Sequence, residues 1–87
     1  AELSNVSDEE KEYLNIKGGA KVLKIGRGKL AEIGVQKGFI ITHISQNGKR
    51  ITVQSASHVL AITQEADKNN EGLYLEGIYE NGDKAYY

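Results

Sequence analysis

Four residue types are missing from this 87-residue chain: cysteine, proline, methionine and tryptophan. Without cysteine there can be no disulfide, no thiolate nucleophile and no cysteine-ligated zinc. A long hydrophobic run is missing too, because no apolar stretch approaches the roughly 20 residues that span a bilayer. Eleven basic and twelve acidic residues leave a net charge of −1, so there is no basic excess for a phosphate backbone. We therefore expect neither a nucleic-acid partner nor membrane insertion.

The length and the balance of residue types indicate one globular domain. Hydrophobic residues make up 39% of the chain and charged residues 26%, which is ordinary for a folded protein. We expect a single domain over residues 1–87 with one modest core. The sequence starts at Ala1 rather than Met and carries no signal peptide. It therefore looks like an excised fragment or a processed product of a larger chain.

Glycine and asparagine supply the turns that proline does not. Asn47-Gly48 and Asn81-Gly82 are both hairpin signals, because the central positions of a type I′ turn need positive φ angles. Phe39–Ile44 is an apolar run of strand type that leads to the first of them. Strict alternation would place Ile40 and Ile44 on one face of that strand and Ile41 with His43 on the other.

Three helices are expected. Ser7-Asp8-Glu9-Glu10 has the form of a capping box and predicts a short helix over 8–14, with Leu14 and Tyr13 turned inward. A second short helix over 29–33 ends at Gly34. The best helix runs from Val53 to Ala66, where apolar residues recur at helical spacing.

The remaining segments read as strands joined by turns, and most neighbours are antiparallel. They cover residues 1–5, 20–25, 39–44, 49–51, 73–79 and 84–87. Strands thus outnumber helices. The pattern predicts an α+β fold that is mainly β, a partly open antiparallel barrel or sandwich of five to six strands. Two helices cap it, and the helix over 8–14 is an addition.

The candidate chemistry is weak. Gly26–Ala31 fits G-x-G-x-x-A, but the following helix is too short and no carboxylate ends the next strand, so a glycine turn is the better interpretation. His43 and His58 have no second ligand at metal spacing. No serine stands in a nucleophile elbow. These patterns predict no catalytic residue, no metal and no cofactor. What remains is a strand edge beside a helix, which can take an extended peptide, unless the helix leaves no groove open.

A family resemblance enters at residues 33–51. The run IGVQKGFIITHIS resembles the GLKKGDVIxxIN signature of bacterial PDZ domains, and QNGKRI resembles the hairpin that follows it. GAKVLKI at residues 19–25 is similar to the family's GVVVxxV strand. AELSN at residues 1–5 resembles the start of the second PDZ domain of HtrA/DegP-type periplasmic serine proteases. The resemblance covers nearly the whole chain and implies a PDZ-like fold.

Three departures from the family pattern matter. Phe39 stands where the family usually has an aspartate after Lys-Gly, and residues 7–14 are an acidic helical insert. The family's carboxylate-binding loop would lie before Ala1. We therefore expect this chain by itself to bind free C-termini weakly or not at all.

The resemblance also implies where a peptide would bind. The floor strand of the groove would be Ala1, Glu2 and Leu3, and the helix wall would be Val53, Ser57 and Leu60, at i, i+4 and i+7. Val53 at the first wall position would favour an apolar peptide residue rather than Ser or Thr.

Two functions follow from the resemblance. One is a non-catalytic domain that binds unfolded or C-terminal peptide segments for a periplasmic protease. The protease domain and another PDZ domain would then lie elsewhere in the parent chain, which would be a homo-oligomer. The other is a structural module that assembles the protease oligomer without any peptide ligand. A small standalone adaptor is a third, weaker alternative.

Overall fold

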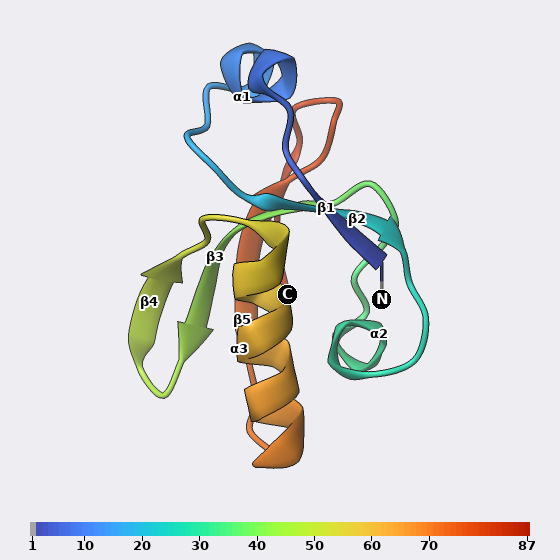
Figure 1. Ribbon diagram of the computed structural model, residues 1–87, viewed down its shortest axis with the longest axis vertical. Coiled ribbons are helices and arrows are strands. Elements are labelled where there is room, and N and C mark those ends of the chain that lie inside the picture. Colours follow the sequence, from blue (N-terminus) through green and yellow to red (C-terminus); the bar gives the residue numbers. More distant parts are fainter. Residues whose placement is uncertain (1) are drawn as a thin grey trace.

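A computed structural model describes residues 2–87, and these residues form six strands and three helices (Figure 1). In chain order the elements are β1 (Glu2–Asn5), α1 (Asp8–Leu14), β2 (Ala20–Lys24), α2 (Lys29–Ile33), β3 (Ile40–Gln46), β4 (Lys49–Thr52), α3 (Ala56–Lys68), β5 (Tyr74–Ile78) and β6 (Lys84–Tyr86). Ala1, predicted as part of the first strand, lies outside the described residues.

All strand pairs are antiparallel, and the sheet is open. The order is β1-β2-β3-β5-β6, and β4 pairs with β3 off this path. β3 is the central strand of the sheet, because it pairs with three others. It pairs with β2 through Ile40 and Ile41, with β4 from His43 onward and with β5 along its length. The expected α+β class with a mainly antiparallel sheet and three helices is confirmed. Within residues 2–87 no helix is long and apolar enough to cross a bilayer.

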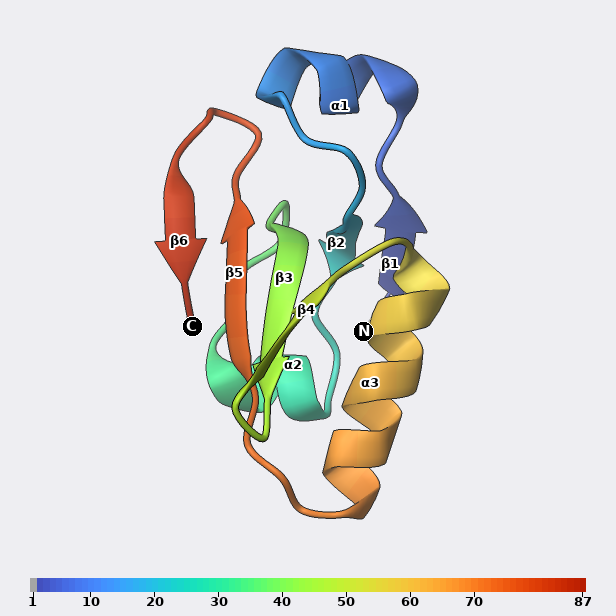
Figure 2. The same ribbon diagram turned by 90° about the vertical axis from the view of Figure 1, so that its left-hand side faces the viewer.

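The helices take different places around this sheet. α3 packs beside it, whereas α1 and α2 lie towards opposite ends of the molecule (Figure 2). The main core joins the buried face of α3 to the sheet through Val59 and Ile62, and it also takes in α2 through Leu30. α1 buries no residue. Tyr13 is 79% exposed, so the prediction that it turns inward is wrong, whereas Leu14 is partly buried.

Both predicted capping signals of α1 are present. The hydroxyl of Ser7 accepts from the backbone N–H of Glu10 at 3.1 Å, and Glu10 Oε1 accepts from the N–H of Ser7 at 3.4 Å. Lys21 on β2 then holds the insert in place, because its Nζ lies 2.7 Å from Glu10 Oε2 and 2.5 Å from Glu80 Oε1. The ion pair with Lys21 lowers the pKa of Glu10, and both carboxylates raise the pKa of Lys21.

The two hairpins differ. Asn47 and Gly48 both have positive φ, 52° and 80°, so the type I′ prediction is confirmed. At the second hairpin only Gly82 has positive φ, and its N–H donates to the carbonyl of Tyr79 at 2.9 Å while the Tyr79 N–H donates to the carbonyl of Asp83 at 2.8 Å. This is a three-residue loop, a type I turn followed by a left-handed glycine, rather than a two-residue turn.

A bulge in β3 overturns the predicted alternation of its faces. Ile41 pairs with Gly77 and His43 with Glu76, so Thr42 has no partner of its own in β5. The extra residue shifts every later side chain to the other face. Ile41 and Ile44 therefore both join the main core, and Ile40 joins a second cluster.

Phe39 is fully buried beneath the C-terminal hairpin. Its ring lies 5.0 Å from that of Tyr79 and 5.2 Å from that of Tyr87, and the two tyrosine hydroxyls are 2.5 Å apart. Burial, together with the hydrogen bond between the Tyr79 and Tyr87 hydroxyls, raises the pKa of Tyr79 to about 12. Phe39, at the position where the PDZ pattern that the sequence resembles has an aspartate, is thus part of the hydrophobic core.

Candidate functional site

β1 is an edge strand with one free side. It pairs with β2 through Leu3↔Val22, Ser4↔Lys21 and Asn5↔Ala20, and within residues 2–87 it has no other strand neighbour. In an antiparallel strand, successive residues direct their N–H and C=O groups alternately towards and away from the neighbour. About half of the backbone groups of β1 therefore face away from β2.

α3 lies along this free side (Figures 1 and 2). The two elements are tied at one end, where the side-chain oxygen of Asn5 accepts a hydrogen bond from the backbone N–H of Ala56 at 2.8 Å. That N–H belongs to the first turn of α3 and has no acceptor within the helix. Asn5 thus caps a helix that begins 51 residues further along the chain, and no sequence pattern near Asn5 predicts this role.

The predicted start of the long helix is wrong. α3 begins at Ala56, with Ser55 as its N-cap, and it ends at Lys68. Ser55 accepts from the N–H of His58 at 3.3 Å, so a local capping signal was present. Val53 lies in the connection before the helix and is 1% exposed. Its apolar side chain belongs to the core, and it does not stand on the helix wall.

Moving the helix start by three residues moves the wall by nearly one turn. The i, i+4, i+7 set counted from the first helical residue is Ala56, Leu60 and Thr63. Leu60 is 38% exposed at the border of the buried face, and Thr63 is buried, with its hydroxyl donating to the carbonyl of Val59 at 2.9 Å. Ser57 is exposed on the outer surface of α3.

The floor residues differ in their exposure. Leu3 is half-buried and packs against the main core, whereas Glu2 is exposed. Of the predicted peptide-binding residues, the structure thus brings Leu3 and Leu60 to elements that lie side by side. Glu2 lies on the same strand, Val53 does not take part, and Ala1 is outside the described residues.

The other sheet edges are less suited to pairing. β4 exposes Lys49 and Arg50, and β6 is three residues long and begins with the exposed Lys84. Short edge strands and outward lysines are common devices against strand addition. β1 differs from both because a helix with an exposed leucine flanks it.

Other chemistry is sparse in the part of the chain that the structure describes. No group of three or more His, Asp or Glu residues is placed to hold a metal ion there. The ring of His58 accepts a hydrogen bond from the backbone N–H of Gln54 at 3.2 Å, which gives it a structural role at the start of α3.

Comparisons of the chain with models of protein families, with curated proteins and with solved structures found no match.

Proposed function

We propose that this chain is a peptide-binding domain of PDZ type, which takes an extended segment as an added strand along β1. The observation that carries the proposal is the free edge of β1 beside α3. Backbone groups of the edge would pair with the ligand, and side chains of α3 would meet its alternate residues. A ligand strand paired to four residues would gain few hydrogen bonds, so contacts with the helix have to contribute much of the affinity.

The family resemblance supports this proposal through the order of the elements and through the helix beside the edge strand. The protease parent and the periplasmic location remain predictions of that resemblance. The revised wall of Ala56, Leu60 and Thr63 is apolar at two of its three positions and so favours apolar ligand residues.

Peptide arrays combined with NMR test the proposal. We expect random heptapeptides rich in valine and leucine to bind, both amidated and with a free carboxylate. On binding, alternate amides of residues 2–5 should become protected from hydrogen exchange, because only those facing away from β2 gain a partner. Shifts should also appear along Ala56–Gln64. A signal confined to other surfaces, or no bound peptide on the whole array, would refute strand addition.

A matched pair of variants sharpens the test. Leu60→Glu removes apolar contact area and forces a carboxylate to desolvate, so peptide affinity should fall roughly tenfold, which corresponds to about 1.4 kcal/mol. Leu23→Glu is the control, because Leu23 is equally exposed, at 37% against 38%, and its strand neighbour Val22 is the residue that faces the core. Equal loss in both variants would count against a groove at Leu60.

The assembly alternative involves contacts between domains without a peptide ligand, and pairing of β1 with β1 of a second copy is one contact that the free edge allows. Sedimentation of the free protein separates the two functions. We expect a monomer whose Leu60→Glu variant loses peptide binding, whereas a concentration-dependent dimer that Leu60→Glu dissociates would favour assembly.

A further inference from the structure

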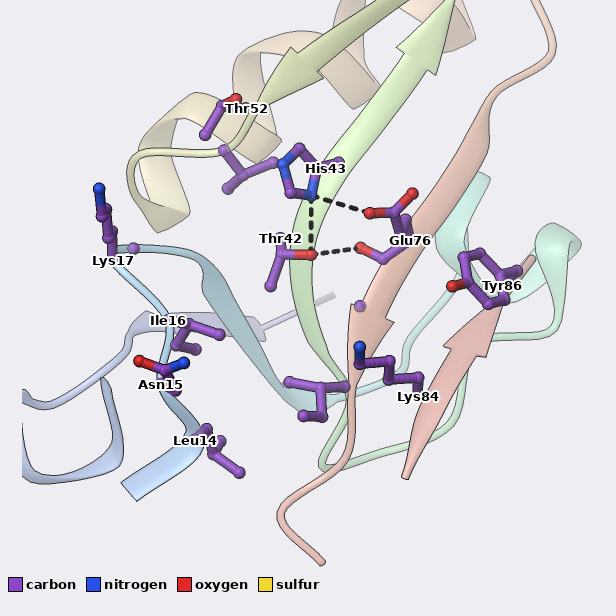
Figure 3. A pocket seen from close by; sticks show the side chains of 14 residues that line it. Leu14, Asn15, Ile16, Lys17, Thr42, His43, Thr52, Glu76, Lys84 and Tyr86 are labelled. Atoms are coloured by element: carbon purple, nitrogen blue, oxygen red, sulfur yellow. Dashed lines mark hydrogen bonds and ion pairs between the residues drawn. The ribbon is translucent and has the colours of Figure 1, made fainter. Parts of the chain in front are cut away.

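A concave site lies away from β1 and α3. The connection between α1 and β2 approaches β3, β5 and β6, and the space enclosed has a volume of ≈ 440 Å³ (Figure 3). Its lining shares no residue with the floor of β1 or with the revised wall of α3. Pockets that bind small molecules are typically about 300–1,000 Å³ in volume. The cavity is thus large enough for a compact ligand.

The bulge in β3 fixes a histidine at this cavity. The Thr42 hydroxyl donates its single hydrogen to the carbonyl of Glu76 at 3.0 Å, so it must accept at its 3.0 Å contact with Nδ1 of His43. Glu76 Oε2, 3.2 Å from Nδ1, is also an acceptor. Nδ1 therefore carries the hydrogen, and in the neutral ring Nε2 is left as an acceptor. Within residues 2–87 Nε2 has no hydrogen-bond partner.

The charges around the cavity favour an anion. Glu76 is already compensated, because its Oε2 lies 2.5 Å from Nη2 of Arg50 as well as near His43. Among the described residues Lys17 and Lys84 make no ion pair. Figure 3 shows them on opposite sides of the cavity, with Lys84 pointing towards Glu76. Two uncompensated ammonium groups therefore border a site that holds one neutralised carboxylate.

Apolar side chains complete the lining. Leu14 is the last residue of α1, Ile16 lies in the connection that follows, and Ile78 is at the end of β5. All three are partly or fully buried and pack in the second hydrophobic cluster. The cavity thus offers an apolar wall, two cations and one hydrogen-bond acceptor.

We propose that this cavity binds a small apolar hydroxycarboxylate. The carboxylate lies near Lys84, while Lys17 adds positive potential from the opposite side of the cavity. The hydroxyl donates to Nε2 of His43, and the apolar body packs on Leu14 and Ile78. The site is independent of the peptide groove, so either can be present without the other.

Three related probes test the proposal by NMR titration. We expect 3-phenyllactate to bind and to shift the amides of residues 14–18, 42–43 and 76–78. 3-Phenylpropionate, which lacks the hydroxyl, should bind more weakly, and 3-phenyllactamide, which lacks the charge, should bind more weakly still. At saturation the two probes that carry the hydroxyl should move the ¹⁵N resonance of His43 Nε2, whereas 3-phenylpropionate should not. Equal affinity for acid and amide, or shifts at Leu3 and Leu60 instead, would overturn the site.

Charge variants provide the second readout. Lys84→Gln should weaken phenyllactate binding about two- to fivefold, as expected for the loss of one exposed ion pair, and adding Lys17→Gln should weaken it further. Lys24→Gln is the control, because Lys24 is an exposed lysine of β2 outside the cavity. Unchanged affinity in the Lys17→Gln/Lys84→Gln protein, with its fold checked by circular dichroism, would also overturn the proposal.

Discussion

Replacing Gly77 by alanine probes the tightest contact in the sheet. A methyl group at Gly77 would overlap the carbonyl oxygen of Ile40 and lie 2.7 Å from Cζ of Phe39. The φ angle of Gly77 is not positive, so the requirement for glycine comes from space and not from backbone conformation. The atoms of Ile40 that the added methyl group would meet belong to the backbone, which cannot change rotamer to make room as a side chain can. β3 and β5 would have to separate where Ile41 pairs with Gly77.

The expected cost is large for a domain of this size. Overpacking a core costs about 1–3 kcal/mol and sometimes more, while alanine recovers about 0.4–1 kcal/mol by restricting the unfolded chain. Because backbone has to move, we expect a net loss of about 2–3 kcal/mol. A chain of 87 residues has a free energy of unfolding of about 4–13 kcal/mol. The melting temperature should therefore fall by about 8–24 °C.

Urea unfolding and thermal melts of Gly77→Ala measure this loss. Gly72→Ala is the matched control, because a methyl group there meets nothing within 4 Å and Gly72 has no positive φ angle. The control should change stability by less than about 1 kcal/mol, in either direction. If Gly77→Ala unfolds within 0.5 kcal/mol of the parent with an unchanged m-value, the close approach of β3 and β5 is wrong.

Three further perturbations test other contacts. Tyrosinate absorbance should show Tyr79 ionising near pH 12, since burial raises its pKa to about 12. The contribution of Tyr79 to stability is complete below the usual tyrosine pKa of about 10 and is lost as the pH rises through the folded pKa. A titration of Tyr79 near pH 10 would refute its burial. The ion pair between Glu10 and Lys21 should weaken at both pH extremes. The pKa of Glu10 is lowered, so its contribution to stability is lost as the pH falls through the folded pKa; the pKa of Lys21 is raised, so its contribution is lost as the pH rises through the folded pKa. Lys21→Met should speed hydrogen exchange in α1 at neutral pH, and unchanged exchange would show that the ion pair does not hold α1 in place. Asn5→Ala should cost about 0.5–2 kcal/mol in urea unfolding by leaving the N–H of Ala56 without its cap, and no loss would mean that water replaces the side chain fully.

Sequence patterns located the short-range features well. The capping box joins Ser7 to Glu10, three residues further along the chain, and the type I′ turn depends on the φ angles of the two adjacent residues Asn47 and Gly48. In such cases the residues that form the feature are adjacent, so their chemistry is enough to predict it. The number of helices and the antiparallel class of the sheet followed from the spacing of these local signals.

The candidate site was predicted only in outline. Leu3 and Leu60 were named in advance, but the wall was displaced because Val53 continues the apolar spacing of the helix without belonging to it. The Ser55 cap marks the start, yet an apolar stripe by itself does not distinguish a helical residue from a buried one just before it.

What the sequence determined by itself was therefore the set of local turns, caps and helices, because each depends on hydrogen bonds and φ angles within a few residues. Tertiary structure decided the rest. Asn5 became a helix cap only because β1 lies beside α3, and Thr42 became the extra residue of a bulge only because β5 pairs on both sides of it. The free edge of β1 and the cavity at His43 are likewise products of pairing between distant segments, and no single stretch of sequence contains them.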